Sequence, residues 1–318
     1  MKEEKPLFDG YPEEKKSIWN KENAQALLIA GAILGLIYWF HSCHPTNSAR
    51  EFLNSKNYDS AYKILEGSLA YPWYKYDPIV YIDLSFCDRR RKNYDRAQKW
   101  LDRGYKLYED PLPAFLNSFQ NVIVRSLLYT EQGYLYTNLE KYDEAIKAFE
   151  TAIKCDPCAS AYIGLAGVTR IQKNNPKTEE VYKKGIEATK KRRYNGRDLE
   201  RLYHERADYY RETNKNVLAI SDLDDALSNY KCKDAYFDRA VLYAENKEFD
   251  KAISDLDSAI ELEKQERFFH QRALYKMELK DNQGALLDIN EAVKIGNPDC
   301  PSLTEDEKWI EQSFKDDR

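Results

Sequence analysis

The apolar positions of residues 204–293 recur with a fixed period. One stripe falls at i, i+1, i+4, i+7 and i+8, as expected for one face of a helix with 3.6 residues per turn. It begins at Ala219 and returns 33 residues later at Ala252 and again at Ala285. A period of about 20–50 residues indicates a solenoid of stacked repeats instead of one globular core.

Each block of this period predicts two helices. The first carries an arginine followed by alanine, at Arg206, Arg239 and Arg272, and the second carries the stripe. Polar turns at 214–216, 246–247 and 280–282 separate the two helices. Small residues at fixed points let helix backbones approach closely. The sequence therefore predicts an all-α stack of helix pairs.

A further block upstream carries a more specific pattern of small, aromatic and proline sites. Its residues are Gly133, Tyr136, Ala145, Phe149, Ala152 and Pro157. This combination resembles the tetratricopeptide repeat (TPR) family. The resemblance implies a right-handed superhelix of about seven helix pairs over residues 47–300. It also implies a non-enzymatic scaffold or adaptor that binds protein or peptide partners.

Both ends of the chain differ from the repeats. Residues 1–23 are charged and predict a disordered tail. Residues 24–42 are almost wholly apolar and predict one transmembrane helix. At the other end, residues 301–318 begin with a capping box and predict a helix that covers the last repeat.

The charges beside the apolar segment predict its orientation. Lys15, Lys16 and Lys21 precede the segment closely, whereas only Arg50 follows it closely. The positive-inside rule then places the N-terminus in the cytoplasm and the repeats across the membrane. We expect a bacterial inner membrane with a periplasmic repeat domain that helps to assemble or stabilise an envelope complex.

Two other interpretations of this segment stay open. It could be a buried core helix. It could also be a lipoprotein leader that is cleaved before a lipidated Cys43. If it spans the membrane, the spacing of Gly31 and Gly35 is one that allows two spans to form a homodimer.

Composition narrows the function classes. The formal net charge of −5 disfavours nucleic acid as a partner, and no glycine-rich phosphate loop or other cofactor motif occurs. Six cysteines in 318 residues are too few for a disulfide scaffold. Cys155 and Cys158 form a C-x-x-C motif, which leaves a redox-active or metal-binding envelope protein as the alternative. We otherwise expect no catalytic, cofactor or metal site.

Two sets of side chains recur or share a face. Arg206 with Asp222, Arg239 with Asp255, and Arg272 with Asp288 keep one separation, so we predict structural ion pairs within each helix pair. By the register of the resembled family, a concave partner-binding surface is formed by Tyr134, Arg201, His204, Asp208, Arg211, Phe237, Val241, Arg267, His270 and Leu274.

Overall fold

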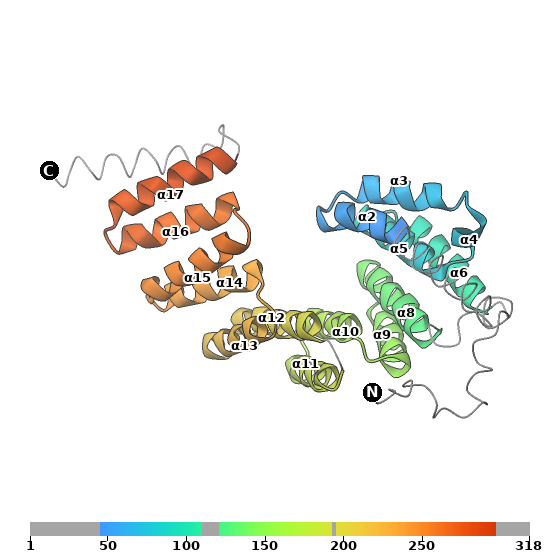
Figure 1. Cartoon of the computed structure of the whole chain (residues 1–318). Coiled ribbons are helices and arrows are strands. Elements are labelled where there is room, and N and C mark those ends of the chain that lie inside the picture. Colours follow the sequence, from blue (N-terminus) through green and yellow to red (C-terminus); the bar gives the residue numbers. More distant parts are fainter. Residues whose placement is uncertain (1–44, 110–120, 193–194, 297–318) are drawn as a thin grey trace, which may run out of the picture. The chain divides into compact units, whose positions relative to one another are not determined.

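The computed structural model describes residues 45–109, 121–192 and 195–296, which belong to two compact units (Figure 1). Every regular element in these ranges is a helix, so the all-α prediction is confirmed. No described helix is long and apolar enough to cross a membrane. The predicted tail at 1–23, span at 24–42 and capping helix at 301–318 lie outside the described residues, as do Gly31, Gly35 and Cys43.

The described residues of the first unit form two helix pairs and one short helix. Its elements are α2 (Pro45–Asn54), α3 (Tyr58–Ser68), α4 (Pro72–Lys75), α5 (Pro78–Arg90) and α6 (Tyr94–Glu109). Leu65, Leu84 and Trp100 belong to its core, where the buried Asp88 accepts a hydrogen bond from the indole of Trp100. The helices thus pack around apolar side chains from both pairs.

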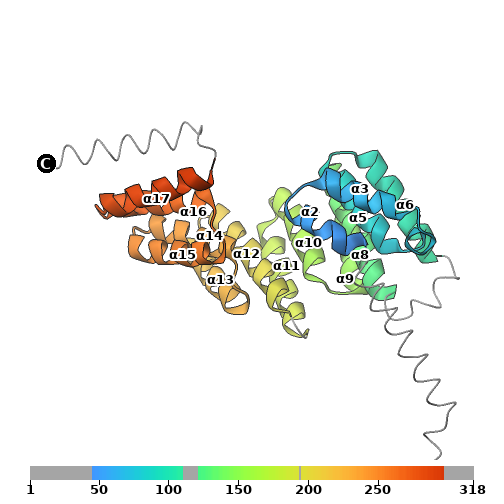
Figure 2. The same ribbon diagram turned by 45° about the horizontal axis from the view of Figure 1, so that its top comes forward.

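Within residues 121–192 and 195–296, the second unit forms five consecutive helix pairs (Figure 2). Its elements are α8 (Asn121–Asn138), α9 (Tyr142–Cys155), α10 (Ala159–Ile171), α11 (Asn175–Lys190), α12 (Gly196–Glu212), α13 (Asn216–Asn229), α14 (Lys233–Glu245), α15 (Phe249–Leu262), α16 (Glu266–Glu278) and α17 (Asn282–Ile295). The second helix of each pair contacts the first helix of the next. With the first unit, the described residues hold the seven expected pairs.

The turn inside every pair has the same geometry. At Lys247 the backbone is left-handed, with a φ of 63°. Its N–H donates to the Ala244 carbonyl, and the N–H of Glu248 donates to the Tyr243 carbonyl, both at 2.8 Å. This Schellman motif satisfies carbonyls that a helix end leaves free. The left-handed residues of the seven turns are Lys56, Lys92, Glu140, Lys173, Asn214, Lys247 and Lys280.

Small residues form the seams between helices. Ala219, Ala252 and Ala285 are fully buried, as the stripe predicts. The fully buried ring of Phe149 lies against Gly133 and Gly164, where an added Cβ would come within 2.7 Å and 2.3 Å of ring atoms. Close approach of helices α8, α9 and α10 therefore requires both glycines.

In the fourth pair, two neighbouring glycines of α10 lie in different surroundings from one another. Thr178, Tyr182 and Gly185 are buried, but a Cβ at Gly167 would meet nothing within 4 Å. Gly164 of the same helix faces Phe149, so it is Gly164, and not Gly167, that allows α10 to approach α9 closely.

Candidate functional site

The predicted Arg–Asp ion pairs form in all three late repeats. Arg206 donates from Nε and one terminal nitrogen to both oxygens of Asp222, at 2.7 and 2.6 Å. Arg239 holds Asp255 in the same way, and Arg272 holds Asp288 at 2.9 and 2.5 Å. The three aspartates are 3–5% exposed. These bidentate pairs join the first helix of a repeat to its second helix.

Two of these arginines also reach the preceding repeat. Arg239 donates to Asp224 of α13 at 2.6 Å, and Arg272 donates to Asp257 of α15 at 2.5 Å. Aromatic rings flank the guanidinium of Arg239, with the Tyr236 and Tyr243 ring centres 5.7 and 5.8 Å away. Three charged groups and two rings therefore lie together in one seam between helices. We interpret this group of side chains as structural.

The residues predicted for the partner surface lie on first helices. α8 carries one of them, α12 four, α14 two and α16 three. We call the set on α12, α14 and α16 the first-helix face; it comprises Arg201, His204, Asp208, Arg211, Phe237, Val241, Arg267, His270 and Leu274. Arg201 and Arg267 are exposed, and the other seven side chains are half-buried.

Tyr134, the predicted residue on α8, lies apart from that set. Its hydroxyl donates to the Ser160 carbonyl of α10 at 2.9 Å, and its ring packs edge-on against Phe149 with centres 5.1 Å apart. Arg201 of α12 reaches the Ser160 hydroxyl at 3.5 Å. Tyr134 and Arg201 thus approach the same residue of the intervening first helix.

Contacts across neighbouring first helices hold several of these side chains in place. Arg267 of α16 forms an ion pair with Asp234 of α14, and its guanidinium lies 4.9 Å from the ring centre of Phe237. The Phe237 ring packs against Phe268 at 5.5 Å. Side chains from successive repeats therefore meet on this face.

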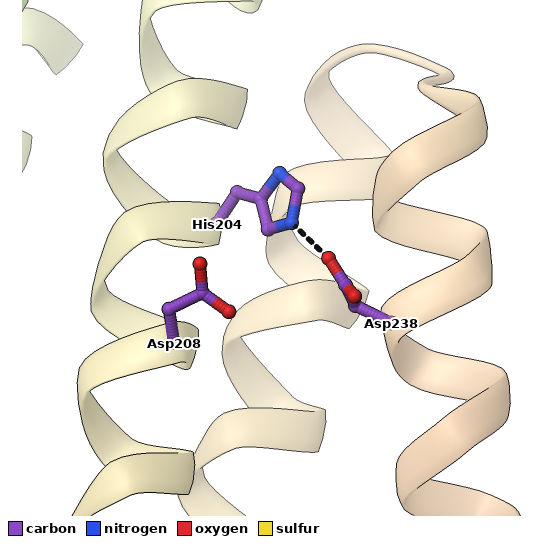
Figure 3. Close-up of side chains that lie close together, drawn as sticks. All are labelled: His204, Asp208 and Asp238. Carbon is purple, nitrogen blue, oxygen red and sulfur yellow. Dashed lines mark hydrogen bonds and ion pairs between the residues drawn. The ribbon is translucent and has the colours of Figure 1, made fainter.

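The most polar part of the face is a cluster between α12 and α14. His204 and Asp208 lie one turn apart on α12, and Asp238 approaches them from α14 (Figure 3). Nε2 of His204 lies 2.6 Å from Oδ2 of Asp238. The other ring nitrogen lies 3.5 Å from the carboxylate of Glu200, which is only 4% exposed.

Arg211 completes the cluster. Its guanidinium lies 3.2 Å from a carboxylate oxygen of Asp208 and 3.8 Å from one of Asp238. Burial alone would lower the pKa of His204, but the hydrogen bonds to Asp238 and Glu200 raise it to about 10. Burial raises the pKa of Asp208, although the charge of His204 acts in the opposite direction. The imidazole is therefore held by carboxylates on both sides.

Comparison with known proteins identifies the repeats. Residues 126–157 match the sequence model of the tetratricopeptide repeat, and residues 204–266 match a second model with the same description. The chain carries tetratricopeptide repeats. Tetratricopeptide repeat protein 12 from Homo sapiens is 29% identical over 109 residues, which cover 32% of this chain. The match spans only 16% of that relative's length.

Solved structures share the fold at low sequence identity. Tom70 from yeast has a TM-score of 0.51 and 16% identity, with 82% of this chain and 60% of that chain covered. PilF from Pseudomonas aeruginosa has a TM-score of 0.50 and 14% identity, with 76% and 97% covered. At this identity the similarity establishes the TPR fold alone.

Sequence reasoning missed the composition of the polar cluster. It placed His204, Asp208 and Arg211 on one face, but it did not identify Asp238 or Glu200 as neighbours of His204. Asp238 lies on another repeat, so only the spacing of first helices in a TPR stack brings it close. A search for charged residues one repeat apart, with an offset of 34, would have found the pair.

The C-x-x-C motif lies at a turn between TPR helix pairs. Cys155 ends α9 and Cys158 precedes α10, and both are half-buried free cysteines. The sulfur of Cys158 lies 3.6 Å from the Ser126 hydroxyl. Asp156, between the two cysteines, forms an ion pair with Arg192 at 3.1 Å. These contacts describe an ordinary turn between repeats.

Proposed function

We propose that this chain is a non-enzymatic TPR scaffold that binds protein or peptide partners through the first-helix face. The supporting observation is the face itself. It presents charged, aromatic and aliphatic side chains from three successive repeats, and they remain at least partly exposed. A face of this composition suits a helix or an extended segment of a partner.

The contacts on the face favour binding by limiting its entropic cost. Arg267 is held by Asp234 and lies over the Phe237 ring, and Arg211 is held by Asp208. Ordering a free long side chain at an interface costs about 0.5–1.5 kcal/mol. Side chains that neighbouring repeats already position avoid part of that cost. Val241 and Leu274 supply apolar contact area between these charged groups.

A crosslinking experiment tests the location of the binding surface. A photoreactive residue is placed at Val241, at Leu274 and, as the control, at Leu287, which is 63% exposed on a second helix. We expect Val241 and Leu274 to capture the same protein and Leu287 not to capture it. Equal capture from Leu287 would refute the proposed surface.

The captured protein is then purified and titrated against variants of the full chain. Val241→Arg combined with Leu274→Arg should weaken binding at least tenfold, because a charged group replaces apolar contact area on the face. Leu287→Arg should leave the dissociation constant unchanged. Unchanged binding by the double variant would show that the partner uses another surface, whatever the crosslinks indicate.

We propose further that residues 24–42 tether the scaffold to a membrane, with the repeats on the far side and an envelope complex as the partner. The support is the sequence: an apolar segment with lysines concentrated before it. Reporter fusions at Arg318 and at the N-terminus test the orientation. Alkaline extraction of membranes tests the tether: we expect the full chain to stay with the membrane fraction. Recovery of the chain in the soluble fraction would refute the tether.

A further inference from the structure

The polar cluster of the first-helix face has the donor set of a metal site. One ring nitrogen of His204 and one carboxylate oxygen each from Asp208 and Asp238 lie within 4.8 Å of one another. Two of the donors come from successive turns of α12, and the third comes from α14 in the next repeat (Figure 3). Three donors from two helices converge on one point between the repeats.

We propose that His204, Asp208 and Asp238 bind a divalent transition-metal ion, with zinc as the representative ion. One imidazole nitrogen with two carboxylate oxygens suits zinc and its neighbours in the first transition row. Calcium and magnesium prefer ligand sets made entirely of oxygen, so the histidine disfavours them. The ion would replace the proton between Nε2 and the Asp238 carboxylate, which now lie 2.6 Å apart, so binding releases a proton and moves the two groups apart.

The groups around the donors support this assignment independently of the three ligands. Histidines that bind metals generally direct their other ring nitrogen to a carboxylate or carbonyl, which fixes the ring and its tautomer. Nδ1 of His204 has such a partner in Glu200, which is almost fully buried and 3.5 Å away. The ring is therefore oriented with Nε2 toward Asp238.

Arg211 has the corresponding role for the carboxylates. Its guanidinium lies 3.2 Å from Oδ1 of Asp208 and 3.8 Å from Oδ1 of Asp238, whereas Nε2 of His204 contacts Oδ2 of Asp238. Each aspartate can thus offer one oxygen to the ion and keep the other near Arg211. The arginine also balances part of the negative charge that two carboxylates and Glu200 place around the site.

Binding of an ion at this location would have two consequences. It would join α12 to α14 and so stabilise the interface between two TPR pairs. Three protein ligands also leave at least one coordination position for water or for a donor atom of a partner. The inference does not depend on the proposed function, because ion binding is measured without a partner.

The test is a calorimetric titration of zinc into the full chain after treatment with a chelator. We expect His204→Ala to remove one bound zinc or to weaken it at least 100-fold. Asp238→Asn, which preserves shape, should have a similar effect. Glu200→Gln should weaken binding about 10- to 100-fold, as loss of an outer carboxylate generally does. Magnesium should not compete at equal concentration.

Controls separate this site from other zinc-binding groups. Cys155→Ser combined with Cys158→Ser, and Asp250→Asn at an exposed position, should keep the His204-dependent binding. Far-UV circular dichroism confirms that each variant is folded, and His204→Gln replaces His204→Ala if that variant unfolds. Zinc binding that is equal in wild type, the His204 variants and Asp238→Asn would overturn the proposal. Absence of zinc binding to the wild-type chain would overturn it as well.

Discussion

Removal of the Asp255 carboxylate tests whether the recurrent Arg–Asp pairs stabilise the stack. Asp255 is 5% exposed and accepts two hydrogen bonds from Arg239, at 2.7 and 2.6 Å. Truncation of one partner of a buried pair costs about 3–5 kcal/mol, because the remaining charge stays buried without compensation. Arg239 retains its exposed neighbour Asp224, so we expect Asp255→Ala to cost about 3 kcal/mol, at the lower end of that range.

A double-mutant cycle isolates the interaction itself. The cycle combines Arg239→Met with Asp255→Ala and should give a coupling energy of about 1–3 kcal/mol. The matched cycle uses Asp224, whose side chain is 53% exposed while it contacts the same guanidinium. An exposed pair contributes only about 0.2–1 kcal/mol, so the second cycle should give a clearly smaller coupling.

Urea unfolding followed by far-UV circular dichroism measures both cycles. The slope of the unfolding transition of each variant is compared with that of the wild type. A changed slope would reveal a departure from two-state behaviour, which arrays of repeats can show. Hydrogen exchange in α14 and α15 shows whether the lost stability is local. A coupling energy for Arg239 and Asp255 that is no larger than the one for Arg239 and Asp224 would refute the burial argument.

Three further predictions concern helix packing, a turn and a buried ion pair, and each is measured by the same unfolding assay. Gly164→Ala should destabilise the second unit by about 1–3 kcal/mol, because the added Cβ would overlap the Phe149 ring. Gly167→Ala should stabilise the unit by up to about 1 kcal/mol, because the Cβ there meets no other atom and alanine favours the helix. Lys247→Gly should be neutral or stabilising by up to about 1 kcal/mol and Lys247→Val destabilising, since φ is 63° there. Asp88→Asn should cost about 3 kcal/mol in the first unit, where both carboxylate oxygens of the fully buried Asp88 accept from Arg96 at 2.7 Å. Equal effects at Gly164 and Gly167, a loss of stability in Lys247→Gly comparable to that in Lys247→Val, or an unchanged midpoint in Asp88→Asn would contradict the respective argument.

The structural features that recur from repeat to repeat could be predicted from the sequence. The period of 33 residues revealed the helix pairs, the buried alanines and the Arg–Asp pairs, because each repeat supplies a copy of the same evidence. The fourth pair is a weak copy of the repeat, and there Gly164, not Gly167, packs against Phe149. The two glycines lie three residues apart on α10, and a weak copy of the pattern does not show which of them faces a neighbouring helix.

The polar cluster could not be predicted by the same route. One period after His204 stands Phe237, and one period after Asp238 stands Gln271. No copy of the cluster exists in the next repeat to draw attention to it. The buried Glu200 is equally hard to recognise, since its proximity to Nδ1 of His204 depends on the helical offset of four residues and on a shielded environment.

This contrast between repeated and single features also indicates where function resides in a stacked fold. Every interface of the stack contributes to stability, so groups that maintain it can recur at the same position, as the Arg–Asp pairs do in the last three pairs. A partner or an ion has one location, so the groups that bind it need to occur only once. On the first-helix face the same register position is occupied by His204, Phe237 and His270 in turn, whereas the position of Arg206, Arg239 and Arg272 does not vary. The variation lies on the face that we propose binds partners, and the three recurrent arginines lie in the seams between helices. Departures from the period are therefore the positions at which substitutions should alter binding without unfolding the stack.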